Sequence, residues 1–139
     1  MGMLSASVEV RVRYGETDKM GIVYHANYLT WFEIARIELL DSIDCPYASL
    51  EEAGFFLPVL SCRVDFRKPA RFDDRLRVVV RIASSSSVRI EAEYEVFRED
   101  ELLASGQTTH AFVSGEGKVI RPPSSFLERV RESEEGSGQ

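Results

Sequence analysis

The chain has 139 residues, of which 44% are hydrophobic and 29% charged, values typical of one globular domain that can bury a core without disulfides or metals. Its formal net charge of −6 argues against nucleic acid and anionic membranes as main partners, because both bind basic protein faces. No apolar run approaches the roughly 18 residues that a transmembrane helix needs, so the sequence predicts no membrane span.

The N-terminus and the cysteines favour a reducing compartment. Residues 1–14 alternate in polarity and include Glu9 and Arg13, so they lack the apolar centre of a signal peptide. Cys45 and Cys62 show no CxxC spacing and are expected to be small buried hydrophobes. We therefore expect a cytoplasmic protein.

The first predicted elements are a strand, a polar loop and a long helix. Valines alternate with charged residues over 8–14, which is typical of a half-buried strand. A glycine-containing loop then leads to a helix predicted over residues 28–43. Asn27 is the expected N-cap, because its side-chain oxygen can accept a hydrogen bond from an early helical N–H.

The long predicted helix is apolar on more than one side. A 100° spacing places on one face Tyr28, Trp31, Phe32, Ala35, Leu39 and Ile43. Ile34 and Ile37 fall on the opposite arc. Since a helix that is apolar on several sides is buried on several sides, we expect another element to wrap it.

Strands dominate the rest of the sequence. Pro46 ends the long helix, and a short helix is predicted over 47–53 before Gly54. Period-two alternation then predicts strands over residues 62–66, 76–82, 88–96 and 102–113. A short C-terminal helix over about 122–130 and a frayed tail over 132–139 complete the chain. This order predicts an α+β domain over residues 1–139, with an ordered core over 8–130 and helices on one face of an antiparallel sheet.

The turn over residues 84–87 joins two predicted strands whose register can be argued from charge. Facing residues have numbers with a constant sum, and an even sum keeps the arginines off the core face. A sum of 170 sets Arg81 against Arg89, a like-charge pair that costs stability. We therefore predict a sum of 172, in which Arg81 faces Glu91 and Arg77 faces Glu95.

The loop before the long helix holds the first candidate for chemistry. A carboxylate near a helix N-terminus stays ionised, so Asp18 can act as a general base or as a nucleophile. The same N-terminus offers backbone N–H donors to a developing oxyanion. Aspartate is also a common helix cap, and spacing alone favours that role for Asp18.

The two histidines lead to different expectations. His25 could be a base, a substrate-orienting donor, or a filler stacked against Tyr24 and Tyr28. His110 lies within a predicted strand, where a structural hydrogen bond is the better interpretation. No cluster of His, Cys or Asp has the spacing of metal ligands, so no metal is predicted.

A basic stretch interrupts this acidic sequence. Between residues 63 and 81 there are seven Lys or Arg against three Asp, a net charge of +4. Part of this excess can pair across the predicted hairpin with glutamates of the next strand. The remainder, Arg67, Lys68 and Arg71, are candidates for contacts to an anionic ligand such as a phosphorylated cofactor.

At this point the sequence resembles a known family. The run Gly15-Glu-Thr-Asp18-Lys-Met-Gly21-Ile-Val-Tyr24-His25-Ala-Asn27-Tyr28, with Trp31-Phe32-Glu33 and Ala35-Arg36 after it, resembles the opening of the hotdog-fold acyl-CoA thioesterases. It is most similar to the 4-hydroxybenzoyl-CoA thioesterase-like group that includes the Tol–Pal-associated enzyme. Residues 66–74 and 106–113 are also similar, so the resemblance covers about residues 8–130. It raises the catalytic interpretation of Asp18 above the capping one.

The resemblance implies a long helix wrapped by a curved antiparallel sheet, and homodimers joined edge to edge or homotetramers with active sites at the interface. It implies hydrolysis of an acyl-CoA, with coenzyme A as part of the substrate and neither a separate cofactor nor a metal. Asp18 would activate water or attack the thioester, the backbone N–H of His25 would bind the oxyanion, and His25 and Tyr24 would shape the acyl pocket. The substrate-binding residues it implies are Gly21, Ile22, Val23, Asn27, Arg67, Lys68 and Arg71. Glu16 stands where many relatives carry Asp, a departure not expected to affect the chemistry.

Other functions leave different signatures. A hotdog hydratase would carry an Asp–His pair in a motif followed by Asn-Pro, which this sequence lacks. A transcriptional acyl-CoA sensor would need a DNA-binding segment, and the domain leaves no residues for one. A non-catalytic acyl-CoA-binding hotdog protein stays open as the alternative. The acyl group, from short chains to fatty acyl or aryl, is left undecided because fold analogy cannot select it.

Overall fold

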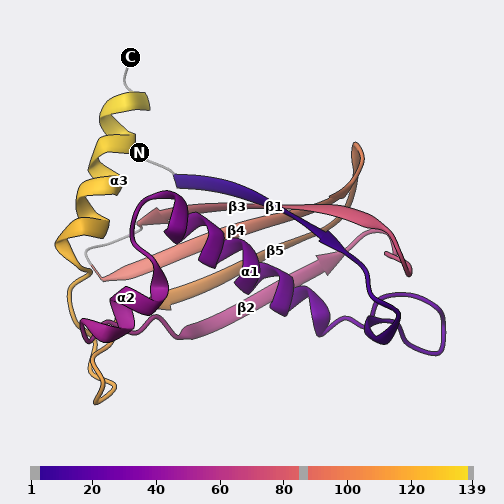
Figure 1. Ribbon diagram of the computed structural model, residues 1–139, viewed down its shortest axis with the longest axis horizontal. Helices are drawn as coiled ribbons and strands as arrows, with labels where there is room; N and C mark the ends of the chain where they lie inside the picture. Colours follow the sequence, from indigo (N-terminus) through magenta and orange to yellow (C-terminus); the bar gives the residue numbers. More distant parts are fainter. Residues whose placement is uncertain (1–3, 85–87, 138–139) are drawn as a thin grey trace.

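A curved antiparallel sheet with one long helix across its face makes up most of the molecule (Figure 1). The computed structural model describes residues 4–84 and 88–137. Its strands are β1 (Leu4–Arg11), β2 (Val59–Phe66), β3 (Arg75–Ser84), β4 (Arg89–Arg98) and β5 (Glu101–Ala111), in the spatial order β1-β3-β4-β5-β2. The helices are α1 (Asn27–Ser42), α2 (Tyr47–Glu52) and α3 (Ser124–Ser137). The α+β class predicted from the sequence is confirmed. Among the described residues, no helix is long and apolar enough to cross a membrane.

Helix α1 buries one face against the sheet. Tyr28, Trp31 and Phe32 are at most 2% exposed, and the Phe32 ring stacks on Tyr94 of β4 with ring centres 4.1 Å apart. Within residues 4–84 and 88–137 no element covers the opposite arc, where Ile34 and Ile37 remain 42% and 39% exposed. The prediction of burial on several sides is therefore wrong for the single chain.

The boundaries around the first loop differ from the predicted ones. Strand β1 ends at Arg11, and residues Tyr14–Glu16 form a 3-10 turn instead of continuing the strand. The N-cap position of α1 is Ala26 and has no side-chain capping bond. Asn27 is the first helical residue, and its amide donates to the backbone oxygens of Glu16 and Tyr24 at 2.9 and 3.2 Å. The capping prediction for Asn27 is wrong, because its side chain points back and fastens the loop.

The β3–β4 hairpin has an even register, but its sum is 174 and not the predicted 172. Arg81 faces Glu93, and Val80 faces Tyr94. The Arg81 guanidinium still reaches a carboxylate, because it donates diagonally to Glu95 at 2.7 Å. A partly exposed charge pair stabilises a protein by only about 0–1 kcal/mol, so charge pairing alone is too weak to select between even registers. Residues 85–87 of the predicted turn lie outside the described residues.

Two further expectations need correction. The C-terminal helix α3 continues to Ser137, so the tail expected to fray from residue 132 is helical over most of its length. Phe126 and Val130 on one side of α3 are buried in the core, and this packing holds the helix in place. Cys45 is buried as predicted, but Cys62 is exposed because it lies on the edge strand β2.

Candidate active site

The loop between β1 and α1 is fastened to the helix by a buried carboxylate. Glu16 is 6% exposed and accepts hydrogen bonds from the Arg13 backbone N–H at 2.7 Å and from the Trp31 indole N–H at 3.3 Å. Its backbone oxygen accepts the N–H of Tyr24 at 2.8 Å. Glu16 therefore connects the loop to the Trp31 side chain on α1 and to the backbone of Arg13 and Tyr24. Sequence reasoning missed this role for Glu16, since nothing local to Glu16 predicts that Trp31 is its partner.

Asp18 occupies a tight turn at the tip of this loop and is not a helix cap. Its N–H donates to the Ile22 oxygen at 2.8 Å, and its carbonyl accepts the N–H of Gly21 at 2.9 Å. Gly21 closes the turn with φ of +78°, a conformation that favours glycine. Asp18 Oδ1 accepts the Met20 N–H at 2.8 Å, whereas Oδ2 has no hydrogen-bond partner among the described residues. The carboxylate is therefore oriented by one oxygen and available through the other.

A cavity of about 340 Å³ lies beside this turn and collects several of the predicted site residues. Its lining combines the loop with the segment that follows β2: Asp18, Met20, Ile22, Val23, His25, Tyr28, Phe66, Arg67, Lys68 and Pro69. The predicted residues Gly21, Tyr24, Asn27 and Arg71 do not line it. Phe66 and Tyr28 were not predicted as lining residues. They meet edge to face with ring centres 5.0 Å apart, a contact between a strand and a helix that are distant in sequence.

The start of α1 presents unused backbone donors close to this cavity. Within residues 4–84 and 88–137, the N–H groups of His25 and Ala26 have no hydrogen-bond acceptor, whereas the N–H of Asn27 donates to the Tyr24 oxygen at 3.0 Å. Unsatisfied N–H groups and the helix dipole together favour a negative charge at this position. The exposed His25 ring packs against Tyr24, with ring centres 4.3 Å apart. The arrangement can therefore hold an oxyanion beside a carboxylate.

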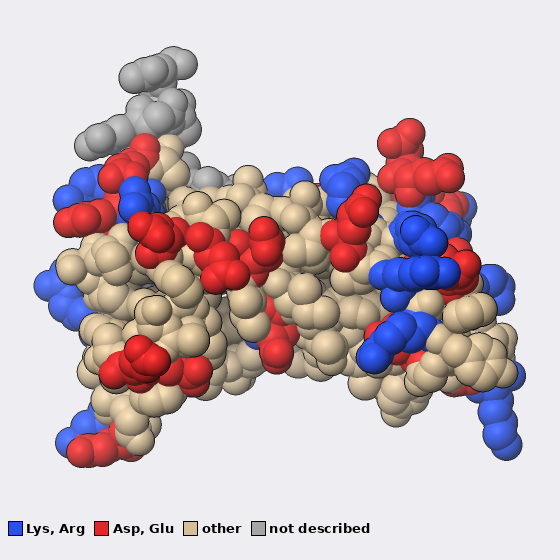
Figure 2. Space-filling view, viewed as in Figure 1, with Lys and Arg blue, Asp and Glu red and all other residues tan. Residues whose placement is uncertain are grey.

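Basic residues border the cavity on its other side. Lys68 donates to Glu101 at 2.7 Å, and this hydrogen bond, with another from Arg98, lowers the pKa of the Glu101 carboxyl. Arg67 has no acidic partner among the described residues. Figure 2 shows several Lys and Arg side chains close together at the end of the molecule that carries the β1–α1 loop. Of Arg67 and Lys68, Arg67 is the stronger candidate for binding an anionic group, because Glu101 already compensates the charge of Lys68.

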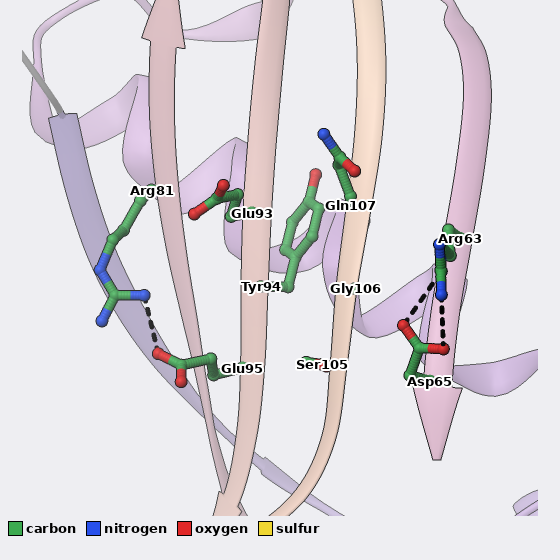
Figure 3. A pocket seen from close by; sticks show the side chains of 9 residues that line it. All are labelled: Arg63, Asp65, Arg81, Glu93, Tyr94, Glu95, Ser105, Gly106 and Gln107. Atoms are coloured by element: carbon green, nitrogen blue, oxygen red, sulfur yellow. Dashed lines mark hydrogen bonds and ion pairs between the residues drawn. The ribbon is translucent and has the colours of Figure 1, made fainter.

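Another cavity lies on the face of the sheet that α1 does not cover (Figure 3), and it is less suited to chemistry. Figure 3 shows its two arginines, each ion-paired within the cavity: Arg63 with Asp65 at 3.1 Å and Arg81 with Glu95 at 2.7 Å. Paired charges offer little to an anionic ligand. Among the described residues, no group of three or more His, Cys, Asp or Glu is placed to hold a metal ion.

His110 has the structural role that the sequence predicted. It is 1% exposed, its Nε2 lies 2.8 Å from the Thr108 hydroxyl, and its Nδ1 lies 3.2 Å from the Pro58 oxygen. Burial, with a smaller effect of the Arg36 charge, lowers the pKa of His110 from 6.5 to about 4. The ring is therefore neutral near pH 7 and takes no part in the Asp18 cavity.

This depressed pKa predicts how stability depends on pH. Between pH 6.5 and about 4, the unfolded chain binds a proton at His110 and the folded chain does not, so stability falls as the pH is lowered through that window. The loss is of order 3 kcal/mol when complete. Urea unfolding from pH 7.5 to 4 should show this slope in wild type and in His25→Gln, and a flatter slope in His110→Gln. Equal slopes in all three proteins would contradict it.

The sequence and the fold are similar to those of known thioesterases. The family model described as the thioesterase-like superfamily matches residues 12–130. The acyl-CoA thioesterase YbgC of Haemophilus influenzae is 33% identical over 119 residues, which are 84% of this chain and 88% of the relative. A DHNA-CoA thioesterase structure from Staphylococcus aureus is similar with a TM-score of 0.89 and 30% identity, covering 97% of this chain and 95% of its own. A 1,4-dihydroxy-2-naphthoyl-CoA thioesterase from Synechocystis gives 0.86 and 27%, covering 94% and 98%.

Proposed function

The chain belongs to the thioesterase-like superfamily and has the hotdog fold of its relatives, and from this premise we propose that it hydrolyses an acyl-CoA with Asp18 as the reacting carboxylate. The enzyme class, thioester hydrolase, follows from its relatives. The observation that carries the residue assignment is that Asp18, oriented through Oδ1 only, and His25, at the start of α1, line one cavity.

In the proposed reaction the thioester carbonyl lies between Asp18 and the start of α1. Asp18 either removes a proton from the attacking water or attacks the carbonyl carbon itself. The backbone N–H of His25 stabilises the oxyanion, and the His25 ring, which packs against Tyr24, borders the acyl group. When Asp18 acts as the base, the C–S bond then breaks, the proton taken from water passes to the thiolate, and the products are a free acid and CoA. When Asp18 is the nucleophile, loss of the thiolate leaves an acyl–Asp18 anhydride, and water then hydrolyses it to the free acid, restores the carboxylate and supplies the proton of the CoA thiol. Coenzyme A enters as part of the substrate, and the proposal uses no metal and no separate cofactor.

Thiol release from a panel of acyl-CoAs tests this proposal. The panel should span short, medium and long fatty acyl groups and hydroxylated aryl groups, because the relatives are named for both acyl-CoA and dihydroxynaphthoyl-CoA. We expect turnover with at least one class and a clear chain-length or aryl preference. Tight binding of acyl-CoA without thiol release across the panel would instead identify a non-catalytic acyl-CoA-binding protein.

The basic border of the cavity is proposed to hold the phosphates of CoA. Replacing Arg67, Lys68 and Arg71 with glutamine should raise KM for acyl-CoA by about tenfold or more, because charge-assisted contacts are lost, while kcat changes little. Substrates truncated to the pantetheine arm should be unaffected. Since Arg71 does not line the cavity, Arg71→Gln alone is the matched control and should have a smaller effect than Arg67→Gln. Equal losses for full and truncated substrates would exclude a phosphate role.

We also propose that the protein is a homodimer or homotetramer. Strand β2 forms one edge of the described sheet and pairs only with β5 there. Its exposed apolar side chains include Val59 (46%), Leu60 (52%) and Phe66 (52%), and such an edge is a template for pairing with another chain. Phe66 lines the Asp18 cavity, so a second copy on this edge would border the site. Light scattering that gave the monomer mass would contradict this arrangement.

A further inference from the structure

The turn between β4 and β5 lies at the same end of the molecule as the β1–α1 loop (Figure 1). Arg98 is the last residue of β4 and is paired with Glu101 across this turn. The Arg98 side chain is partly buried and does not line the Asp18 cavity. It nevertheless contacts the segment after β2 that forms the basic border of that cavity.

The Arg98 guanidinium binds three acceptors from three parts of the chain. Its Nη1 donates to Asp74 Oδ2 at 2.8 Å and to the Pro69 backbone oxygen at 3.3 Å. Its Nη2 donates to Glu101 Oε1 at 2.6 Å. The hydrogen bonds to Glu101 and Asp74 raise the pKa of Arg98, so the side chain stays charged. Because a guanidinium is planar and presents its N–H donors in fixed directions, it can hold these acceptors in one arrangement.

Each of the three acceptors is connected to the basic border. Pro69 lines the cavity itself. Asp74 Oδ2 also accepts the backbone N–H of Arg71 at 2.8 Å. Glu101 also accepts a hydrogen bond from the Lys68 ammonium at 2.7 Å. One side chain that lies outside the cavity therefore fixes the border at several positions.

The same segment also connects the border to the opposite side of the cavity. Ala70 is fully buried, and its backbone oxygen accepts the N–H of Val23 at 2.8 Å. Burial raises the pKa of the Tyr28 hydroxyl, whereas a hydrogen bond with the Ala70 backbone and the charge of Arg98 oppose this increase. Val23 and Tyr28 both line the cavity, so the position of this segment affects more than the border alone.

The contacts of Arg98 differ from those of an ordinary surface ion pair. The side chains of Arg98 and Asp74 are 31% and 22% exposed, whereas those of the Arg63–Asp65 pair are 75% and 56% exposed. Exposed pairs contribute little, because water screens the charges and both side chains lose freedom. Partly buried charges that share their partners form a network, which holds its members in place more firmly than an isolated pair does.

We propose that Arg98 is a positioning residue for the thioester site, which holds Pro69 and the basic border in the geometry that receives acyl-CoA. The inference rests on the proposed function, because it assigns a further residue to the same site. The Asp18 turn is closed by hydrogen bonds of its own, to Met20 and Ile22. Loss of the Arg98 contacts should therefore weaken substrate binding more than it slows the chemical step.

Steady-state kinetics with two substrates test this role. Arg98→Met should raise KM about tenfold for acyl-CoA and also for the substrate truncated to the pantetheine arm, with kcat within about threefold of wild type. A pure charge effect would act only on the substrate that carries phosphates, and loss of folded protein would lower the apparent kcat at constant KM. An increase in KM for acyl-CoA alone, or no increase, would overturn the proposal.

Two further variants separate geometry from charge. Arg98→Lys keeps the charge but lacks the planar array of donors, so its KM for both substrates should lie between those of wild type and Arg98→Met. Arg81→Met is the matched control, because it removes another partly buried arginine that is paired with a carboxylate, outside the Asp18 cavity. It should leave both KM values unchanged. A similar increase in Arg81→Met would show that the effect is not specific to Arg98.

Amide hydrogen exchange tests the positioning without substrate. In Arg98→Met the N–H groups of Lys68 and Arg71 should exchange at least about tenfold faster, while that of Val113, beyond the far end of β5, should not change. Unchanged exchange at Lys68 and Arg71 would overturn the proposal. If the wild type turned over no acyl-CoA of the panel, the proposed function would fail, and exchange alone would decide whether Arg98 holds the border. If Arg98→Met does not fold, wild-type KM and exchange in Arg98→Lys would overturn the proposal.

Discussion

Asp18→Asn is expected to lower kcat by a factor of about 10² to 10⁴, the usual contribution of a positioned acid–base group. Asparagine keeps an oxygen that can accept the Met20 N–H at the position of Asp18 Oδ1, so the turn closed by Gly21 should persist. What the substitution removes is the negative charge, and with it both the base and the nucleophile. Because the cavity itself is retained, KM should change far less than kcat.

The assay measures steady-state thiol release with the best acyl-CoA of the panel. Asp100→Asn, the same substitution at an exposed position outside the cavity, is the control and should retain wild-type turnover. Circular dichroism and urea unfolding should show that Asp18→Asn is folded. Turnover of Asp18→Asn within a few-fold of wild type would refute the assignment of Asp18, whatever the substrate.

Gly106→Ala is expected to lower the free energy of unfolding by about 1–3 kcal/mol, the usual cost of overpacking a core. A Cβ atom at Gly106 would lie 2.6 Å from Cζ of Phe32 and 3.0 Å from the backbone oxygen of Arg63. The Phe32 ring cannot retreat easily, because it is fully buried and stacks on Tyr94. The absence of a side chain at Gly106 thus lets α1 pack close to the sheet. Gly106→Val should lower the free energy of unfolding more than Gly106→Ala does.

Urea unfolding with two comparisons checks this expectation. Gly115→Ala is the matched control, since its Cβ would meet only Phe56 at 3.7 Å, an ordinary contact, and it should change stability little. In a Phe32→Leu background the cost of Gly106→Ala should shrink, because the smaller side chain leaves room. A loss of the same size in both backgrounds would show that the strain has another origin.

Local periodicity was sufficient for the element types and for the faces of the strands. The period-two pattern of β3 and β4 fixes which side chains meet the core, and the structure buries Val78, Val80 and Tyr94 as that pattern requires. The 3.6-residue pattern likewise identified the buried stripe of α1. These properties depend on neighbours in sequence, so they can be read without the tertiary structure.

The choice between equivalent registers could not be read in this way. The registers with sums of 172 and 174 direct the same side chains to the core, so the hydrophobic pattern does not distinguish them. The argument from charge pairs selected the wrong register, because partly exposed ion pairs are weak. In the observed register Arg77 lies over the Phe97 ring at 4.7 Å, a contact that charge counting does not consider. The exposure of Cys62 and Ile37 was missed for a related reason, since it depends on which strand forms the edge and on what covers α1.

The α+β class, the buried face of α1 and the polar loop with Asp18 can be predicted from the sequence, because each is encoded by residues close together in the chain. Phe66, Arg67 and Lys68 line a cavity with Asp18 because of tertiary contacts, a backbone bridge from Ile22 to Arg71 and a hydrogen bond from Val23 to Ala70. The position of Arg98 between Asp74 and the Pro69 carbonyl is likewise a tertiary property. Both depend on contacts between segments far apart in sequence, whose geometry is set by packing and not by local pattern.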